Sequence, residues 1–134
     1  MAKSKFPPLL HLSYILQHSA EEMLETETGI GLSAARIMST LSGSTASSQR
    51  LIASELKQTE ANVSRQLHAM KKEGLVKITR NKKDSRQRDV ILTAKGGQKY
   101  NEAQKVLRRQ QKQFLKILNA GEVTTIEYAA QKLS

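Results

Sequence analysis

Apolar residues recur every three or four positions along most of this chain, and this spacing predicts helices. The first predicted helix covers residues 8–27 and ends at the glycine-containing segment Thr28–Gly31. A second helix is expected over residues 33–41, with Ser33 as its N-cap, because a serine side chain can accept a hydrogen bond from the first turn. The small and polar residues 42–47 then predict a loop.

The middle of the chain changes from a helical to an alternating pattern. Residues 48–57 predict a short helix, and a second one, capped by Thr59, is expected to run to a C-terminal glycine at Gly74. Apolar and polar residues then alternate over 75–80 and 88–92, which predicts two strands joined by a polar loop. Two short helices followed by a hairpin predict a mainly α (α+β) fold, a winged helix-turn-helix with a two-stranded wing.

The last third of the chain is predicted to be helical. Thr93 can cap a long helix that reaches about Asn119, and Ala120-Gly121 is interpreted as a break. Thr124 and Glu127 have the spacing of a capping box, so a final short helix is expected to begin there.

Composition narrows the class of protein. With 134 residues, 38% of them hydrophobic, the chain is expected to form one domain over residues 1–134. It contains no cysteine, which excludes disulfides and thiolate metal sites.

The N-terminal residues fit neither a signal peptide nor a membrane span, so no membrane partner and a cytoplasmic location are expected. No grouping of residues suggests catalysis, a cofactor or a metal, and we expect no enzyme activity.

The net charge of +10 is unevenly distributed. Residues 48–96 contain twelve basic and five acidic side chains, a balance of +7, whereas residues 1–47 carry −1 and residues 97–134 carry +4. An electropositive segment that coincides with a helix-turn-helix pattern indicates double-stranded DNA as the partner.

The second helix of this pair has the residues needed to read bases. Val63, Leu67 and Met70 form its apolar stripe, and the remaining surface includes small, amide, hydroxyl and guanidinium side chains. Arginine can bond a guanine edge and asparagine an adenine edge. The predicted DNA-binding residues of this helix are Thr59, Ala61, Asn62, Ser64 and Arg65.

The predicted hairpin loop is unusually basic. Lys82, Lys83, Arg86 and Arg88 lie within eight residues, and Asp84 is the one acid among them. Such a loop can reach a minor groove or flanking phosphates, so these four cations are predicted to bind DNA. Asp84 is expected to hold Arg86 in place through a local salt bridge.

These segments together carry a resemblance to a known family. They resemble the corresponding segments of MarR-type transcription regulators. The matching segments are the helix-turn-helix Gln49–Leu56 and Val63–Leu67, the junction Met70–Val76, the wing sequence Asp84-Ser85-Arg86 and the exit Leu92–Gly96. The combination of the Asp-x-Arg wing with the Leu-Thr-x-x-Gly exit at this spacing is specific. The resemblance is strong over residues 48–96, and the order of helices extends it over most of the chain.

The resemblance implies a homodimer that represses genes from a pseudo-palindromic site. Residues 30–96 would form the DNA-binding part, and residues 8–28 and 97–134 the helical dimerisation part. Ala61, Asn62, Ser64 and Arg65 match the family's base-reading positions, and Arg86 matches the wing arginine. Many family members release DNA when a small molecule, an oxidant or a metal binds, which implies an inducer here as well.

Two departures from the family pattern bear on these roles. Glu60 stands at the start of the reading helix, where many members have a basic or neutral residue. The first helix looks short, which implies a reduced ligand pocket.

Other interpretations stay open at this stage. An architectural or plasmid or phage accessory DNA-binding protein without an inducer fits the same pattern, and a protein-interaction module fits less well because the basic wing is intact. His11 and His18 are interpreted as surface histidines rather than metal ligands. The cationic stripe of the long helix fits either a solvated face or pairing with the acidic first helix across a dimer; it consists of Lys105, Arg109, Lys112 and Lys116.

Overall fold

The computed structural model describes residues 5–43 and 46–134. Its elements follow in the order α1 (Pro8–Thr28), α2 (Leu32–Leu41), β1 (Ser47–Ser48), α3 (Gln49–Leu56), α4 (Glu60–Lys72), β2 (Val76–Arg80), β3 (Arg88–Leu92), α5 (Ala94–Leu115) and α6 (Ala120–Leu133). The predicted mainly α fold, a winged helix-turn-helix with flanking helices, is confirmed.

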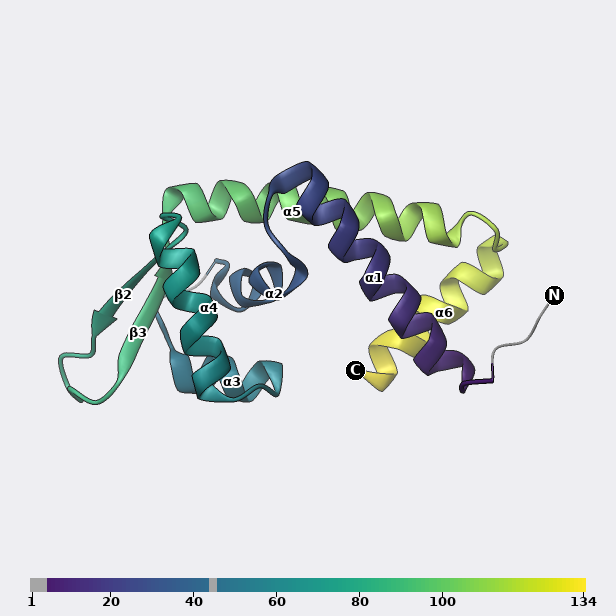
Figure 1. The fold of residues 1–134 in the computed structure, drawn as a ribbon. Helices are drawn as coiled ribbons and strands as arrows, with labels where there is room; N and C mark the ends of the chain where they lie inside the picture. The colour runs from purple at the N-terminus through teal and green to yellow at the C-terminus, as the bar shows by residue number, and fades with distance from the viewer. Residues whose placement is uncertain (1–4, 44–45) are drawn as a thin grey trace.

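The elements are arranged along the long helix α5. Figure 1 shows α2, α3, α4 and the β2–β3 hairpin beneath the N-terminal half of α5, whereas α6 turns back from its other end. Helix α1 contacts α5 and leads away from the winged helix, so that its N-terminus lies at the end of the molecule far from the wing. The hairpin projects from the opposite end.

The core lies where the winged helix meets α5 and the C-terminal half of α1. Its largest fully buried side chains are all apolar, as the helical and alternating patterns predict, and they are Leu24, Ile37, Met38, Ile52, Val63, Leu67, Leu75 and Val90. Each buried side chain of this kind stabilises the fold by about 1.5–3 kcal/mol. The core therefore fixes the orientation of α3, α4 and the wing relative to α5.

The wing belongs to a three-stranded antiparallel sheet with the order β1-β3-β2. The predicted hairpin is confirmed, with Ile78 opposite Val90 in the middle of its register. The short strand β1 pairs Ser47 with Val90 and Ser48 with Asp89, where the predicted loop 42–47 meets the predicted helix 48–57. Two residues are too few to show alternation, so this strand was missed. Residues 44–45 of the predicted loop lie outside the described residues.

Two predicted helix starts are wrong. Helix α2 begins at Leu32 rather than after Ser33, because the Glu21 carboxylate of α1 accepts a hydrogen bond of 2.7 Å from the Leu32 N–H. This cap comes from a residue eleven positions earlier, which local sequence does not reveal.

Helix α6 begins at Ala120, so Ala120-Gly121 is the first turn rather than a break. Its capping box consists of Asn119 and Glu122, each side chain accepting from the other residue's N–H, and not of the predicted Thr124 and Glu127.

Long-range polar contacts join the flanking helices to the rest of the chain. The buried Gln110 of α5 donates to the Leu16 carbonyl of α1 at 2.8 Å, and Lys99 donates to the Thr28 carbonyl at 2.9 Å. Arg109 forms an ion pair with Glu27. One member of the cationic stripe therefore pairs with the acidic first helix within the same chain, and the other three side chains are exposed.

Candidate nucleic-acid interface

Helix α4 is held by its apolar stripe and its N-cap. Val63 and Leu67 are fully buried and Met70 is 4% exposed, which confirms the predicted inward face. The Thr59 hydroxyl accepts a hydrogen bond of 3.1 Å from the Asn62 N–H, so Thr59 caps the helix as predicted. At the other end Gly74 adopts a φ of +77°, which glycine adopts without steric cost, and the chain turns into β2.

The predicted reading residues lie on the accessible side of α4. Ala61 and Arg65 are exposed, whereas Asn62 and Ser64 are half-buried at the flanks of this face. The Arg65 guanidinium donates to Asn62 Oδ1 at 3.4 Å, so these two side chains are neighbours. Glu60, the residue that departs from the family pattern, lies in the first turn of α4 and is also exposed.

The wing loop is ordered by side-chain acceptors. Asn81 Oδ1 accepts from the backbone N–H groups of Lys83 and Asp84 at 2.8 and 2.9 Å. Asp84 Oδ1 accepts from the Arg86 N–H at 3.0 Å, and the Asp84 carbonyl accepts from the Gln87 N–H. Asparagine and aspartate stabilise turns in this way.

The predicted salt bridge between Asp84 and Arg86 is not formed. Asp84 holds the backbone of Arg86, and among the described residues the Arg86 guanidinium has no ion pair or hydrogen bond. The physical reason is that the carboxylate is already engaged by the turn two residues away. The Arg86 side chain is therefore exposed and available to a partner.

The end of the hairpin next to the wing loop places two cations opposite each other. Arg80 and Arg88 are paired across the strands and both are exposed. Like charges directly opposite on a sheet destabilise it. An anion bound between the two guanidinium groups would relieve this repulsion.

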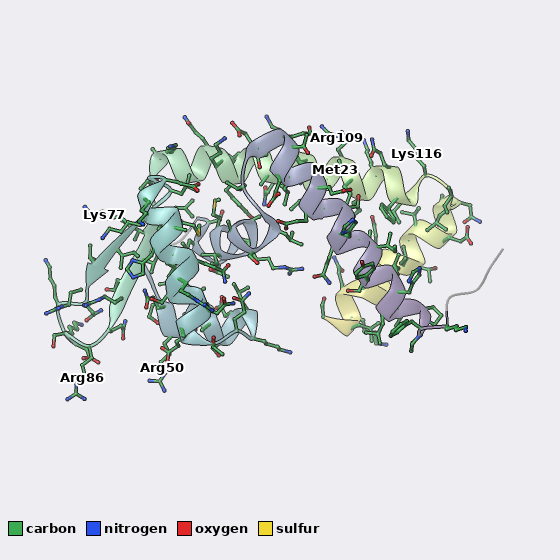
Figure 2. All side chains as sticks on the ribbon, in the orientation of Figure 1. Met23, Arg50, Lys77, Arg86, Arg109 and Lys116 are labelled. Carbon is green, nitrogen blue, oxygen red and sulfur yellow. The ribbon has the colours of Figure 1, made fainter. Side chains whose placement is uncertain are left out.

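The cationic side chains of α3 and the wing face the same way. Figure 2 shows Arg50 of α3 and Arg86 at the wing tip projecting beyond the same end of the molecule, away from Lys116 and Arg109. Lys82 and Lys83 are exposed in the same loop as Arg86. Sequence reasoning missed Arg50, although a cation in the first turn of the first helix of the pair is a signal that could have indicated it.

The contacts between the start of the wing and the start of α5 explain the Leu-Thr-x-x-Gly motif at the exit from the wing. The Thr93 hydroxyl donates to the Gly74 carbonyl at 2.6 Å and accepts from the Gly96 N–H, which caps α5. A Cβ on Gly96 would lie 2.1 Å from the Leu75 carbonyl oxygen. Only glycine allows α5 to approach the start of the wing this closely.

A cleft of about 400 Å³ lies between α1, α2 and α5. Apolar side chains including Leu16, Leu32 and Leu107 line it, with Arg36 and Arg108 among the polar residues. It borders both the winged helix and the flanking helices.

Within residues 5–43 and 46–134, no helix is both long and apolar enough to cross a membrane. The same ranges contain no group of three or more histidine and carboxylate side chains suited to a metal. The His18 ring stacks on the Tyr14 ring, and His18 Nε2 lies 3.9 Å from Glu22 Oε1.

The fold and this basic surface define a winged helix-turn-helix protein. The MarR family model matches residues 28–87, from the end of α1 to the wing loop. No curated relative matches the sequence. The structure is similar to the crystal structure of a MarR protein, with a TM-score of 0.89, 15% identity and coverage of 99% of this chain and 92% of the other.

Two further solved structures are similar over nearly their whole length. One is a complex of S. aureus MepR with DNA, with a TM-score of 0.81, 17% identity and coverage of 98% and 97%. The other is the PcaV transcriptional regulator of Streptomyces coelicolor with its natural ligand, with a TM-score of 0.78, 18% identity and coverage of 99% and 96%. At these identities the likeness is one of fold. The chain therefore has the winged helix-turn-helix fold of these structures, and the part of it that matches the MarR family model contains α2, α3, α4, β2 and the wing loop.

Proposed function

We propose that this protein is a sequence-specific regulator that binds double-stranded DNA as a homodimer. The observation that carries the proposal is the position of the exposed Arg65 and its neighbour Asn62 on an N-capped, core-anchored α4. The wing that follows this helix exposes Arg86. A rigid helix with bidentate donors on its open face suits base reading in a major groove.

The residues of the interface divide into two roles. Asn62 and Arg65 are proposed to read base edges, while Ala61 and Ser64 allow a close approach and Thr59 presents the helix N-terminus to a phosphate. Arg50, Lys82 and Lys83 are proposed to contact phosphates. Arg86 is proposed to enter the adjacent minor groove, and Arg88 shares a phosphate with Arg80.

The homodimer is proposed to form through residues 8–28 and 97–134, leaving residues 30–96 for DNA. Helix α6 has no buried residue, and large apolar side chains are exposed on α1, on α6 and near the end of α5: Leu9, Leu10, Tyr14, Ile117, Ile126, Tyr128 and Leu133. Such a concentration of exposed apolar area marks an interaction surface. A two-fold dimer favours a pseudo-palindrome with half-sites about one helical turn apart, roughly 10 bp.

We also propose repression, relieved by a small molecule in the cleft between α1, α2 and α5. A dimer that occupies a promoter site excludes competing proteins from it. The cleft borders both the flanking helices and the winged helix, so a ligand there could change the spacing of the two reading helices. Its apolar lining and the nearby Arg36 and Arg108 favour an anionic aromatic compound.

Selection of bound duplexes from a random DNA pool, followed by titration of the selected site and a scrambled one, tests the proposal. We expect an enriched pseudo-palindrome that is bound at least a hundredfold more tightly than the scrambled duplex, because specific and non-specific binding usually differ by about 10³ or more. Binding that depends only on the length and shape of the DNA would instead support an architectural or accessory protein.

A further inference from the structure

A chain of side-chain hydrogen bonds connects the turn between α3 and α4 to the reading face of α4. Gln58 Oε1 accepts from Asn62 Nδ2 at 3.0 Å and from Gln66 Nε2 at 2.9 Å. Asn62 Oδ1 in turn accepts from Arg65 Nη2 at 3.4 Å. The order of contacts is therefore Gln58, Asn62, Arg65, from the turn outward.

Gln58 is a fixed anchor for this chain of contacts. It is half-buried, and its backbone N–H donates to the Ala53 carbonyl at 3.0 Å. The preceding residue, Lys57, ends α3 in a left-handed conformation with a φ of +54°. The position of the Gln58 side chain is thus set by the end of α3, and not by α4 itself.

A gain in folding stability does not explain why Gln58, Asn62 and Gln66 carry amide side chains. Gln66 Oε1 is buried and has no hydrogen-bond partner in the described part of the chain. An unsatisfied buried oxygen costs about 1–3 kcal/mol, which an apolar side chain at this position would avoid. The contacts between Gln66, Gln58 and Asn62 are therefore better explained by positioning than by stabilisation.

The contacts of Asn62 leave one donor and one acceptor of its amide to bond a base in a single orientation. An asparagine amide has two N–H donors and two acceptor lone pairs. Gln58 uses one donor and Arg65 one lone pair, so one of each remains. This is the pair that adenine N7 and N6 require. Without Gln58, the amide could rotate and exchange its donor and acceptor ends.

We infer that Gln58 is a positioning residue for DNA reading, which fixes the Asn62 amide and thereby sets base specificity without touching a base. The inference rests on the proposed function. It predicts that removing the Gln58 acceptor changes which bases are preferred, and changes non-specific affinity little.

The test compares Gln58→Met, which keeps the size but removes the acceptor, with Gln58→Glu, which keeps an acceptor for both neighbours. Full-length proteins are titrated on the selected duplex and on duplexes substituted at each position. For Gln58→Met we expect the preference at one A·T position per half-site to fall by about tenfold, within the range of one bidentate contact. Gln58→Glu should keep that preference, even though its negative charge weakens binding to all DNA.

A double-mutant cycle with Asn62→Ala separates positioning from a structural role. If Gln58 acts through Asn62, adding Gln58→Met to Asn62→Ala should cause no further loss of preference. An equal loss in both backgrounds, or a similar loss on scrambled DNA with a lower melting temperature, would overturn the inference. A wild-type protein that binds selected and scrambled DNA equally overturns the proposed function as well. If the wild type discriminates and Gln58→Met does so equally well, this inference alone is wrong.

Discussion

At the scale of single residues, two adjacent glycines have opposite environments. Gly96 packs against the Leu75 carbonyl, whereas a Cβ on Gly97 would meet nothing within 4 Å. The sequence identified Gly96 as part of a family motif, but it could not supply the reason. That reason is a contact between residues twenty-one positions apart, which no local pattern encodes.

We predict that Gly96→Ala destabilises the protein by about 2–3 kcal/mol, because the methyl group would force α5 away from the wing. Gly97→Ala is the matched control and should stabilise by up to about 1 kcal/mol through helix propensity. Urea unfolding at one fixed protein concentration measures both, since a dimer's stability depends on concentration. Equal effects of the two substitutions would contradict the packing argument.

Arg65 gives a second prediction at this scale. If it bonds a guanine edge, Arg65→Ala should cost about 1–3 kcal/mol on the selected site and relax base choice at one position per half-site. Lys82→Ala is the control, because losing a phosphate contact should weaken binding to all sequences and lower the salt dependence by about one unit of slope. If Arg65→Ala also weakens binding to all sequences equally, Arg65 contacts a phosphate rather than a base.

At the scale of elements, sequence patterns succeeded where a cap or a period lies within the element. The apolar stripe of α4, its cap Thr59 and the β2–β3 hairpin were all predicted, because each depends on neighbouring residues. The start of α2 was wrong because its cap comes from Glu21 in another helix. The start of α6 was also wrong, because the capping box was predicted at Thr124 and Glu127 and the structure has it at Asn119 and Glu122.

The wing loop allows a prediction whose sign distinguishes two roles of Asp84. Asp84→Asn removes a negative charge but keeps an oxygen that can accept from the Arg86 N–H, so it should tighten DNA binding. Asp84→Ala removes the same charge together with the acceptor that orders the turn. We expect Asp84→Ala to weaken binding to the selected site, despite the gain in net charge, because the Arg86 backbone is no longer held.

Titration of DNA with both Asp84 variants at two salt concentrations distinguishes the effect of the charge from the effect of a disordered turn. Charge effects shrink as salt rises, whereas a disordered turn weakens binding at both concentrations. Tighter binding by Asp84→Ala at both would mean that the turn acceptor contributes nothing to DNA binding.

At the scale of the whole molecule, the sequence predicted the electropositive segment but not how its members are grouped. The projection of Arg50 toward the same end of the molecule as Arg86 depends on the packing of α3 against α4 (Figure 2). The contacts of Gln58 with α4 depend on the same packing and on the left-handed turn at Lys57. Both are tertiary features that periodicity does not encode.

The exposed apolar surface of the flanking helices leads to the last prediction. Leu10 on α1 is 63% exposed and Leu133 on α6 is 75% exposed, and both belong to the group of exposed large apolar side chains on the flanking helices that marks an interaction surface. If a second copy covers both, a double Leu10→Glu and Leu133→Glu variant must bury unpaired charges in the interface. Because such burial costs several kcal/mol, the dimer dissociation constant should rise by at least a hundredfold.

The control for this prediction is a double Leu51→Glu and Ile91→Glu variant. It adds the same charges at exposed apolar positions of the winged helix, 50% and 38% exposed, and should leave the dimer intact. Sedimentation velocity over a range of concentrations measures the dissociation constants. A wild-type protein that sediments as a monomer at micromolar concentration, with and without the selected duplex, would show that the apolar surface has a different partner. The dimer variant should also lose affinity for a full palindrome but retain it for an isolated half-site, because each α4 and wing remains folded and only the linkage between the two copies is removed.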